Sequence, residues 1–175
     1  MIFCDYIDEL GMYYLYTHGE FDLEIMKECR ARLLEAGATV ASLARPVIQD
    51  ISDVELTESS LAEFRRHINQ GVQTGEDKGS YPIAVHVGSL GSYGMMRMYT
   101  ALAEAAELRH EGQLFHSMHR EDVARWFSNA IGLGDPERIV RLMQQKRLEA
   151  IRACRSAQDT VLWGPGLSYL VENAA

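Results

Sequence analysis

The residues best suited to bind a ligand lie in a glycine-rich turn between an apolar strand and an amphipathic helix. The segment Gly88-Ser-Leu-Gly-Ser-Tyr-Gly contains three glycines and two serines where the chain must reverse direction. Free backbone N–H groups and the helix dipole favour an anion at a helix start, and Arg97 lies one turn further on. The segment lacks the GKS or GKT ending of a P-loop and the GxGxxG pattern of dinucleotide-binding proteins. It is therefore either a pocket for a carboxylate or phosphate group or a simple turn.

A second polar group follows the strand predicted at residues 46–51. Asp50, Ser52 and Asp53 cluster at the C-terminal end of this strand. Ligands of open α/β sheets gather at the C-terminal strand ends, so we expect this cluster to approach the serines of the glycine-rich turn. The helix after that turn is predicted to begin with Ser92 as its N-cap. The predicted ligand-binding residues are Asp50, Ser52, Ser89, Ser92, Tyr93, Arg97 and Met98.

The helix after the turn also carries a cluster of methionines. Met95, Met96 and Met98 could belong to the core, as such a stripe commonly does, or could line an adaptable apolar pocket. In the second case Tyr93 and Tyr99 would lie with them against an acyl chain. The sequence thus leaves open a role as a carrier of a lipid or another acyl ligand.

Catalytic and metal-binding motifs are weak in this sequence. His116 and His119 have a metal-ligand spacing, but the first belongs to a predicted strand and the second to the loop beyond it. No serine or cysteine lies in a GxSxG elbow, so triad chemistry has no support. We expect no catalytic residue, no metal and no cofactor. A small hydrolase, the remaining alternative, would need Asp50, His86 or His119 to meet a serine of the turn.

Composition excludes some partners. A net charge of −8 and a pI near 5.2 argue against nucleic acid, whose binding draws on clustered lysine and arginine. Three cysteines without a CxxC pair fit a reducing compartment. The N-terminus lacks the basic region of a signal peptide, and no apolar run approaches the ~18 residues of a membrane span. We expect a cytoplasmic protein without integral membrane association.

Alternation of apolar strands and amphipathic helices predicts the fold class. The order implies an α/β fold, with a mixed, mostly parallel sheet, one antiparallel edge strand and flanking helices. The first two strands form a hairpin or bent pair with Gly11 in the turn, and residues 38–45 form a short strand or an extended segment. Strands are predicted at 2–8, 12–18, 46–51, 81–87 and 113–117, and helices at 22–37, 59–71, 92–108 and 119–131.

The last 44 or so residues read as a helical extension. Two glycines at 132–134 break the chain, after which Asp135 is a predicted N-cap and Pro136 the first helical residue. A charged helix to Arg155 leads to an apolar segment at 161–171, which must dock on this molecule or on a second copy. We predict a domain at 1–131, an extension at 132–175 and a homodimer involving residues 136–171.

Two stretches resemble a known family. They are Val47-Ile-Gln-Asp-Ile-Ser-Asp-Val-Glu-Leu-Thr, which precedes a helix, and Ile83-Ala-Val-His-Val-Gly-Ser with the helix containing Arg97-Met-Tyr. Residues 1–131 resemble the SpoIIAA-like group of small bacterial proteins, which is related in fold to STAS domains and more distantly to CRAL-TRIO lipid carriers. The resemblance implies a non-enzymatic binding or regulatory domain, acting on a protein partner or on a small anionic or amphipathic ligand. STAS regulators carry a phosphorylatable serine at a comparable turn. Here Ser52 has aspartates on both sides that would repel phosphate, and local turn hydrogen bonds are the expected alternative.

Overall fold

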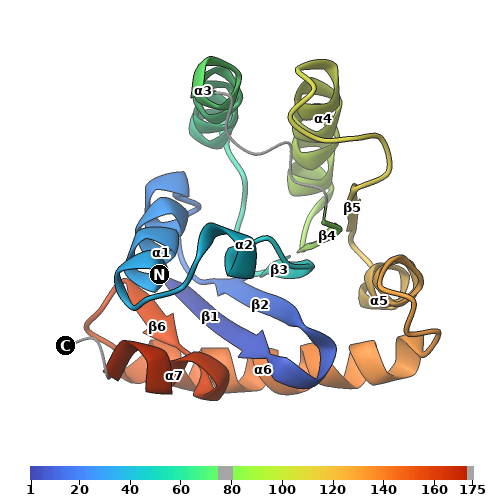
Figure 1. Cartoon of the computed structure of the whole chain (residues 1–175). Helices are drawn as coiled ribbons and strands as arrows, with labels where there is room; N and C mark the ends of the chain where they lie inside the picture. The colour runs from blue at the N-terminus through green and yellow to red at the C-terminus, as the bar shows by residue number, and fades with distance from the viewer. Residues whose placement is uncertain (75–80, 173–175) are drawn as a thin grey trace.

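A six-stranded mixed sheet organises the chain. The computed structural model describes residues 1–74 and 81–172 (Figure 1). The strands lie in the order β5-β4-β3-β2-β1-β6. Strands β2 to β5 are parallel, whereas β1 is antiparallel to β2 and parallel to β6. The strands are β1 (Ile2–Ile7), β2 (Met12–Thr17), β3 (Val47–Ile51), β4 (Ile83–Val87), β5 (Leu114–Ser117) and β6 (Val161–Trp163).

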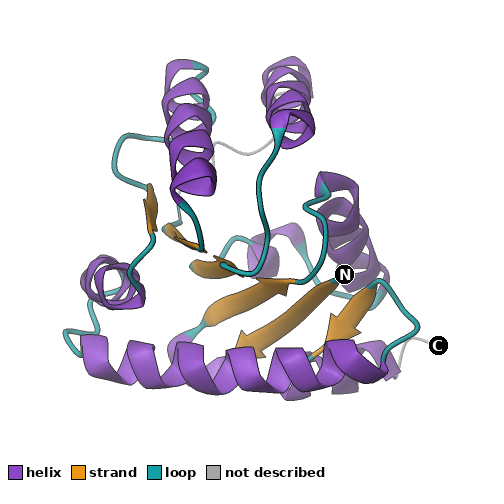
Figure 2. Cartoon of the chain, turned by 180° about the vertical axis from the view of Figure 1, so that it is seen from behind, coloured by secondary structure: helices purple, strands orange, loops and turns teal. Residues whose placement is uncertain are grey.

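Helices cover both faces of this sheet and confirm the predicted α/β class. Helices α1, α3 and α4 lie on one side, called here the cavity face, and α5 and α6 cover the other, called the α6 face (Figures 1 and 2). Along β3, Ile48 packs in the core of the α6 face and Ile51 in that of the cavity face, as expected for a strand buried on both sides. The helical segments are η1 (Asp8–Leu10), α1 (Leu23–Glu35), α2 (Val40–Leu43), α3 (Glu58–Thr74), α4 (Leu90–Ala105), α5 (Arg120–Ala130), α6 (Pro136–Ser156) and α7 (Pro165–Glu172).

The structure confirms the predicted turn at Gly11, the start of the helix predicted at 22–37 and the predicted cap of the C-terminal helix. Gly11 takes the left-handed conformation, with φ of 58°, between β1 and β2. The Asp22 carboxylate caps α1 by accepting from Glu24 N at 2.8 Å. Asp135 caps α6 in the same way, with Pro136 as the first helical residue.

Two local predictions are wrong. The N-cap of α4 is Ser89, whose Oγ accepts from Ser92 N at 3.1 Å, so the helix begins three residues earlier than Ser92 would place it. Gly91 and Gly94 lie inside the helix because helix packing and this cap outweigh their low helix propensity, whereas Gly88 precedes the cap. Within the segment 38–45, Thr39 and Ser42 form a capping box that starts the short helix α2 where a strand or extended segment was expected.

The C-terminal segment is integrated into the fold. Strand β6 pairs with β1 and forms the sheet edge, so the antiparallel pair lies one strand further inside than predicted. Helix α6 runs along the sheet on the α6 face (Figure 2). Val161 and Leu167 are buried, so these side chains dock on this molecule, one of the two predicted outcomes. The homodimer and the boundary at residue 131 stay predictions.

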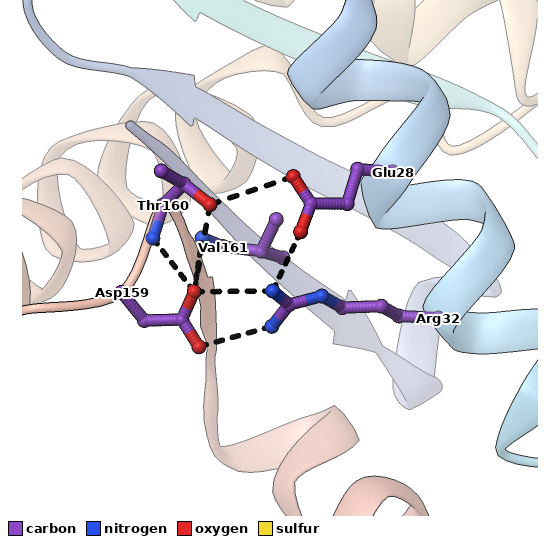
Figure 3. Close-up of polar contacts among 5 residues, drawn as sticks. All are labelled: Glu28, Arg32, Asp159, Thr160 and Val161. Carbon is purple, nitrogen blue, oxygen red and sulfur yellow. Dashed lines mark hydrogen bonds and ion pairs between the residues drawn. The ribbon is translucent and has the colours of Figure 1, made fainter.

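An ion-pair cluster anchors α1 to the start of β6. Arg32 donates to both carboxylate oxygens of Asp159, at 2.9 and 3.2 Å, and pairs with Glu28 (Figure 3). Asp159 also accepts from the backbone N–H groups of Thr160 and Val161. The Arg32 hydrogen bonds are the main reason that the pKa of Asp159 falls to about 2. One side of α1 is thereby fixed, and its opposite side lines the cavity described next.

No helix in the described ranges 1–74 and 81–172 is long and apolar enough to cross a membrane.

Candidate functional site

A cavity of about 520 Å³ lies between the sheet and helices α1, α3 and α4. This volume is in the range of ~300–1,000 Å³ common for small-molecule sites. Its floor consists of side chains from five strands that point to the cavity face. The floor residues are Cys4, Tyr13, Leu15, Val47, Gln49, Ile51, Ile83, Val85 and Leu114.

Helix α1 forms one wall of the cavity with an unusual stripe. Leu23, Met26 and Leu34 line the cavity at helical spacing, as in an ordinary amphipathic helix. Lys27 and Arg30 lie in the same stripe and also line the cavity. Lys27 Nζ donates to Gln70 Oε1 of α3 at 3.1 Å and pairs with Glu24 at 2.7 Å. The polar mouth of the cavity therefore lies where α1 faces α3.

Aromatic side chains of α3 and α4 form the opposite wall. The Phe64 and Tyr99 rings lie 4.6 Å apart, and both residues line the cavity. Burial raises the pKa of Tyr99, and the charge of Arg109 opposes this. The Arg109 guanidinium lies 4.9 Å from the centre of the Tyr81 ring, as in a cation–π contact. This wall therefore contributes aromatic rings to the cavity, together with the tyrosine hydroxyls and the Arg109 guanidinium.

The cavity floor contains one amide and two thiols. Gln49 Nε2 donates to the Met26 sulfur at 3.4 Å, and a thioether is a weak acceptor. The amide can therefore exchange this contact for a stronger one to a ligand at little cost. Cys4 and Cys29 are buried beside it. A hydrogen bond with Cys29 and burial raise the pKa of Cys4, so that its thiol stays protonated.

Asp50, the first of the predicted site residues, lies on the α6 face and not in this cavity. It is fully buried and accepts four hydrogen bonds. Ser52 contributes two of them, from Oγ at 2.6 Å and N at 3.1 Å, and Tyr14 Oη and His86 Nδ1 each lie 3.1 Å away. Burial raises the pKa of Asp50, but the hydrogen bond and charge of His86 and the bonds from Ser52 lower it to about 2. Ser52 thus makes the local turn hydrogen bonds expected as the alternative to phosphorylation.

A neighbouring ion pair joins this network to helix α6. Arg147 Nη2 donates to Asp53 Oδ1, and Tyr16 Oη donates to Asp53 Oδ2, both at 2.5 Å. The Arg147 pair and the Tyr14 and Tyr16 hydroxyls were not foreseen from the sequence, because they come from segments up to 94 positions away. The sequence did offer one indication of these hydroxyls, because tyrosines at positions 14 and 16 of a strand lie on the same face of the sheet. The network fixes α6 against the ends of β2 and β3.

Ser89 and Ser92 meet each other but not Asp50. Ser89 Oγ donates to Glu55 Oε1 at 3.0 Å. The buried Ser92 Oγ accepts from Leu56 N at 3.0 Å and lies 3.3 Å from Val54 O. A carboxylate of the chain itself, that of Glu55, therefore occupies the helix start where an external anion was predicted.

The remaining predicted site residues lie at different places on α4. Tyr93 packs against His116 with ring centres 5.0 Å apart. Arg97 and Met98 are exposed, Met98 by 40%. Of the methionine and tyrosine cluster, Met96 and Tyr99 line the cavity. The structure thus brings two members of the proposed acyl-binding cluster to a cavity.

Metal coordination and family membership gain no support. Over the described residues, no group of three histidine, cysteine, aspartate or glutamate side chains is placed to hold a metal ion. Comparison with protein families, curated proteins and solved structures found no match to this chain. The resemblance to SpoIIAA-like proteins stays a prediction.

Proposed function

We propose that the protein is a binding domain for an apolar or amphipathic small molecule, held in the cavity between the sheet and helices α1, α3 and α4. The observation that carries this proposal is the cavity itself, with about 520 Å³ enclosed mainly by aliphatic and aromatic side chains. Apolar surface in contact with water is costly at ~25 cal/mol per Å². A ligand with a matching apolar surface removes that cost.

The distribution of polar groups supports the same choice of site. At the C-terminal strand ends, Asp50, Ser89 and Ser92 are engaged with partners in the chain. In the cavity, Gln49 has only a thioether contact among the described residues. Ligand sites combine an apolar lining with a few polar groups that fix orientation. The acyl-carrier alternative therefore fits the geometry better than a site at the strand ends.

Binding of diphenylhexatriene, a neutral fluorescent apolar probe, tests the proposal. Leu15→Trp places an indole in the cavity floor and should abolish probe binding. Leu148→Trp is the matched control, because Leu148 is 56% exposed on α6, on the other side of the sheet. Circular dichroism would establish that both variants fold. The proposal fails if the wild-type protein does not bind the probe, or if both variants bind it as the wild type does.

A further inference from the structure

Within residues 1–74 and 81–172, the charged residues that line the cavity all carry the same sign. They are Lys27, Arg30 and Arg109. The chain has 25 acidic and 17 basic residues and a net charge of −8. The charged side chains that the described residues contribute to the lining are therefore opposite in sign to the net charge of the chain. This bias indicates the charge of the ligand.

Two of these cations are set side by side at the mouth between α1 and α3. Lys27 and Arg30 are three residues apart on α1, so their side chains extend from neighbouring positions of one helix face. Like charges at this spacing destabilise a helix slightly. An anion bound between them would reverse that effect.

Lys27 contacts two exposed side chains, Gln70 of α3 and Glu24 of its own helix. The Lys27–Glu24 pair is exposed, with 42% and 64% of the two side chains accessible, and solvent-exposed pairs of this kind add little stability. Arg30 is exposed and has no ion pair within residues 1–74 and 81–172. Both heads can therefore turn toward a ligand at little cost. Gln49 lies below, in contact with Met26 beside Lys27.

We infer that the ligand is an anionic amphiphile, whose apolar chain fills the cavity and whose carboxylate or phosphate head group is bound by Lys27 and Arg30. The inference rests on the proposed function, because it names the ligand class of the same cavity. A charge-assisted hydrogen bond from each side chain would orient the head at the α1–α3 mouth. The chain would then extend over the floor toward Phe64 and Tyr99.

Calorimetric titration of the full chain with four ligands of equal chain length tests the inference. The ligands are dodecanoate, dodecyl phosphate, dodecanol and dodecyltrimethylammonium. The two anions should bind about tenfold more tightly than dodecanol, and the cation more weakly, and salt should weaken only the binding of the anions. The tighter of the two anions identifies the head group.

Paired variants locate the head-group site. The double variant Lys27→Gln/Arg30→Gln should lose about tenfold in affinity for dodecanoate and keep its affinity for dodecanol. Arg152→Gln/Arg155→Gln is the matched control, because these exposed arginines have the same spacing on α6. If dodecanol binds as tightly as dodecanoate, or the double variant binds both as the wild type does, the head-group inference is overturned and the proposed function survives. If neither ligand binds, both fail.

Discussion

The substitution Asp50→Asn tests whether the polar network of the α6 face is a structural element or a ligand site. It keeps the shape of the side chain and removes one negative charge from a fully buried position. Burial raises the pKa of Tyr14, so its hydroxyl stays protonated and donates to Asp50. An asparagine can still accept the bonds from Ser52 through its single oxygen. The asparagine lacks the negative charge that strengthens all four hydrogen bonds to the Asp50 carboxylate.

The expected cost follows from the pKa of Asp50. A folded-state value of about 2 against an ordinary value of 3.8 corresponds to about 2 kcal/mol of stability at neutral pH. The loss of a buried charge from its hydrogen-bond partners costs a similar amount. In a chain of this size, such a loss lowers the melting temperature by roughly 4–8 °C.

The pH dependence gives a second, independent signature. Because the pKa of Asp50 is lower in the folded state, its contribution is complete above the unfolded-state pKa of about 4. As the pH falls toward the folded-state pKa of about 2, that contribution disappears. The free energies of unfolding of wild type and Asp50→Asn should therefore differ at pH 7 and converge below about pH 4.

Urea unfolding followed by circular dichroism from pH 7 to pH 3 measures both signatures. Asp8→Asn is the control, since Asp8 is exposed in the first turn of η1, and it should change stability little. The same preparation should bind dodecanoate as the wild type does, because Asp50 lies across the sheet from the cavity. An Asp50→Asn protein with wild-type stability at pH 7, or one that has lost dodecanoate binding, would refute the reasoning.

Two further predictions concern a close backbone approach and the cavity thiols. A Cβ at Gly88 would overlap the carbonyl oxygen of Ser52, whereas one at Gly94 would meet nothing within 4 Å. Gly88→Ala should thus destabilise the protein by ~2 kcal/mol or more, whereas Gly94→Ala should stabilise it by ~0.5–1 kcal/mol. Urea unfolding measures both changes. Equal effects of the two substitutions on stability would contradict the close contact at Gly88. Cys29 lines the cavity and Cys154 packs on the α6 face. Bound dodecanoate should slow the alkylation of Cys29 by iodoacetamide and leave the alkylation rate of Cys154 unchanged. Mass spectrometry of the peptides measures both rates. Equal slowing at the two cysteines would exclude the cavity as the binding site.

Most of the sheet could be predicted from the sequence, because its strands are short apolar runs bounded by turn residues. The runs at Ile83–Val87 and Val47–Ile51 are buried on both faces, and a near-continuous apolar sequence is the usual mark of such a strand. Strand β6 has three residues and pairs with β1, some 159 positions earlier at the start of the chain. Local patterns carry no information about such a partner, so the sheet edge was missed.

The site predicted at the strand ends required two turns that approach each other and side chains that point into one pocket. The turns after β3 and β4 do meet, with Gly88 against the carbonyl of Ser52. However, residues that follow one another in a strand point to opposite faces. Asp50 therefore points toward α6, while Ser89 and Ser92 bind Glu55 and the backbone beside it. Proximity along the sheet edge did not bring these side chains into one pocket.

The two faces of the sheet differ in how their side chains are arranged. On the α6 face, Tyr14 donates to the buried Asp50 carboxylate, and Tyr16 and Arg147 donate to the exposed Asp53 carboxylate, so both carboxylates have partners within the chain. On the cavity face, a space of about 520 Å³ remains between the sheet and helices α1, α3 and α4. Lys27 and Arg30 interrupt the apolar stripe of α1, and this interruption was visible in the sequence. Both side chains are exposed and also reach the cavity lining. Apolar residues at these two positions would serve packing alone, whereas cations there can also bind the head group of an anionic amphiphile.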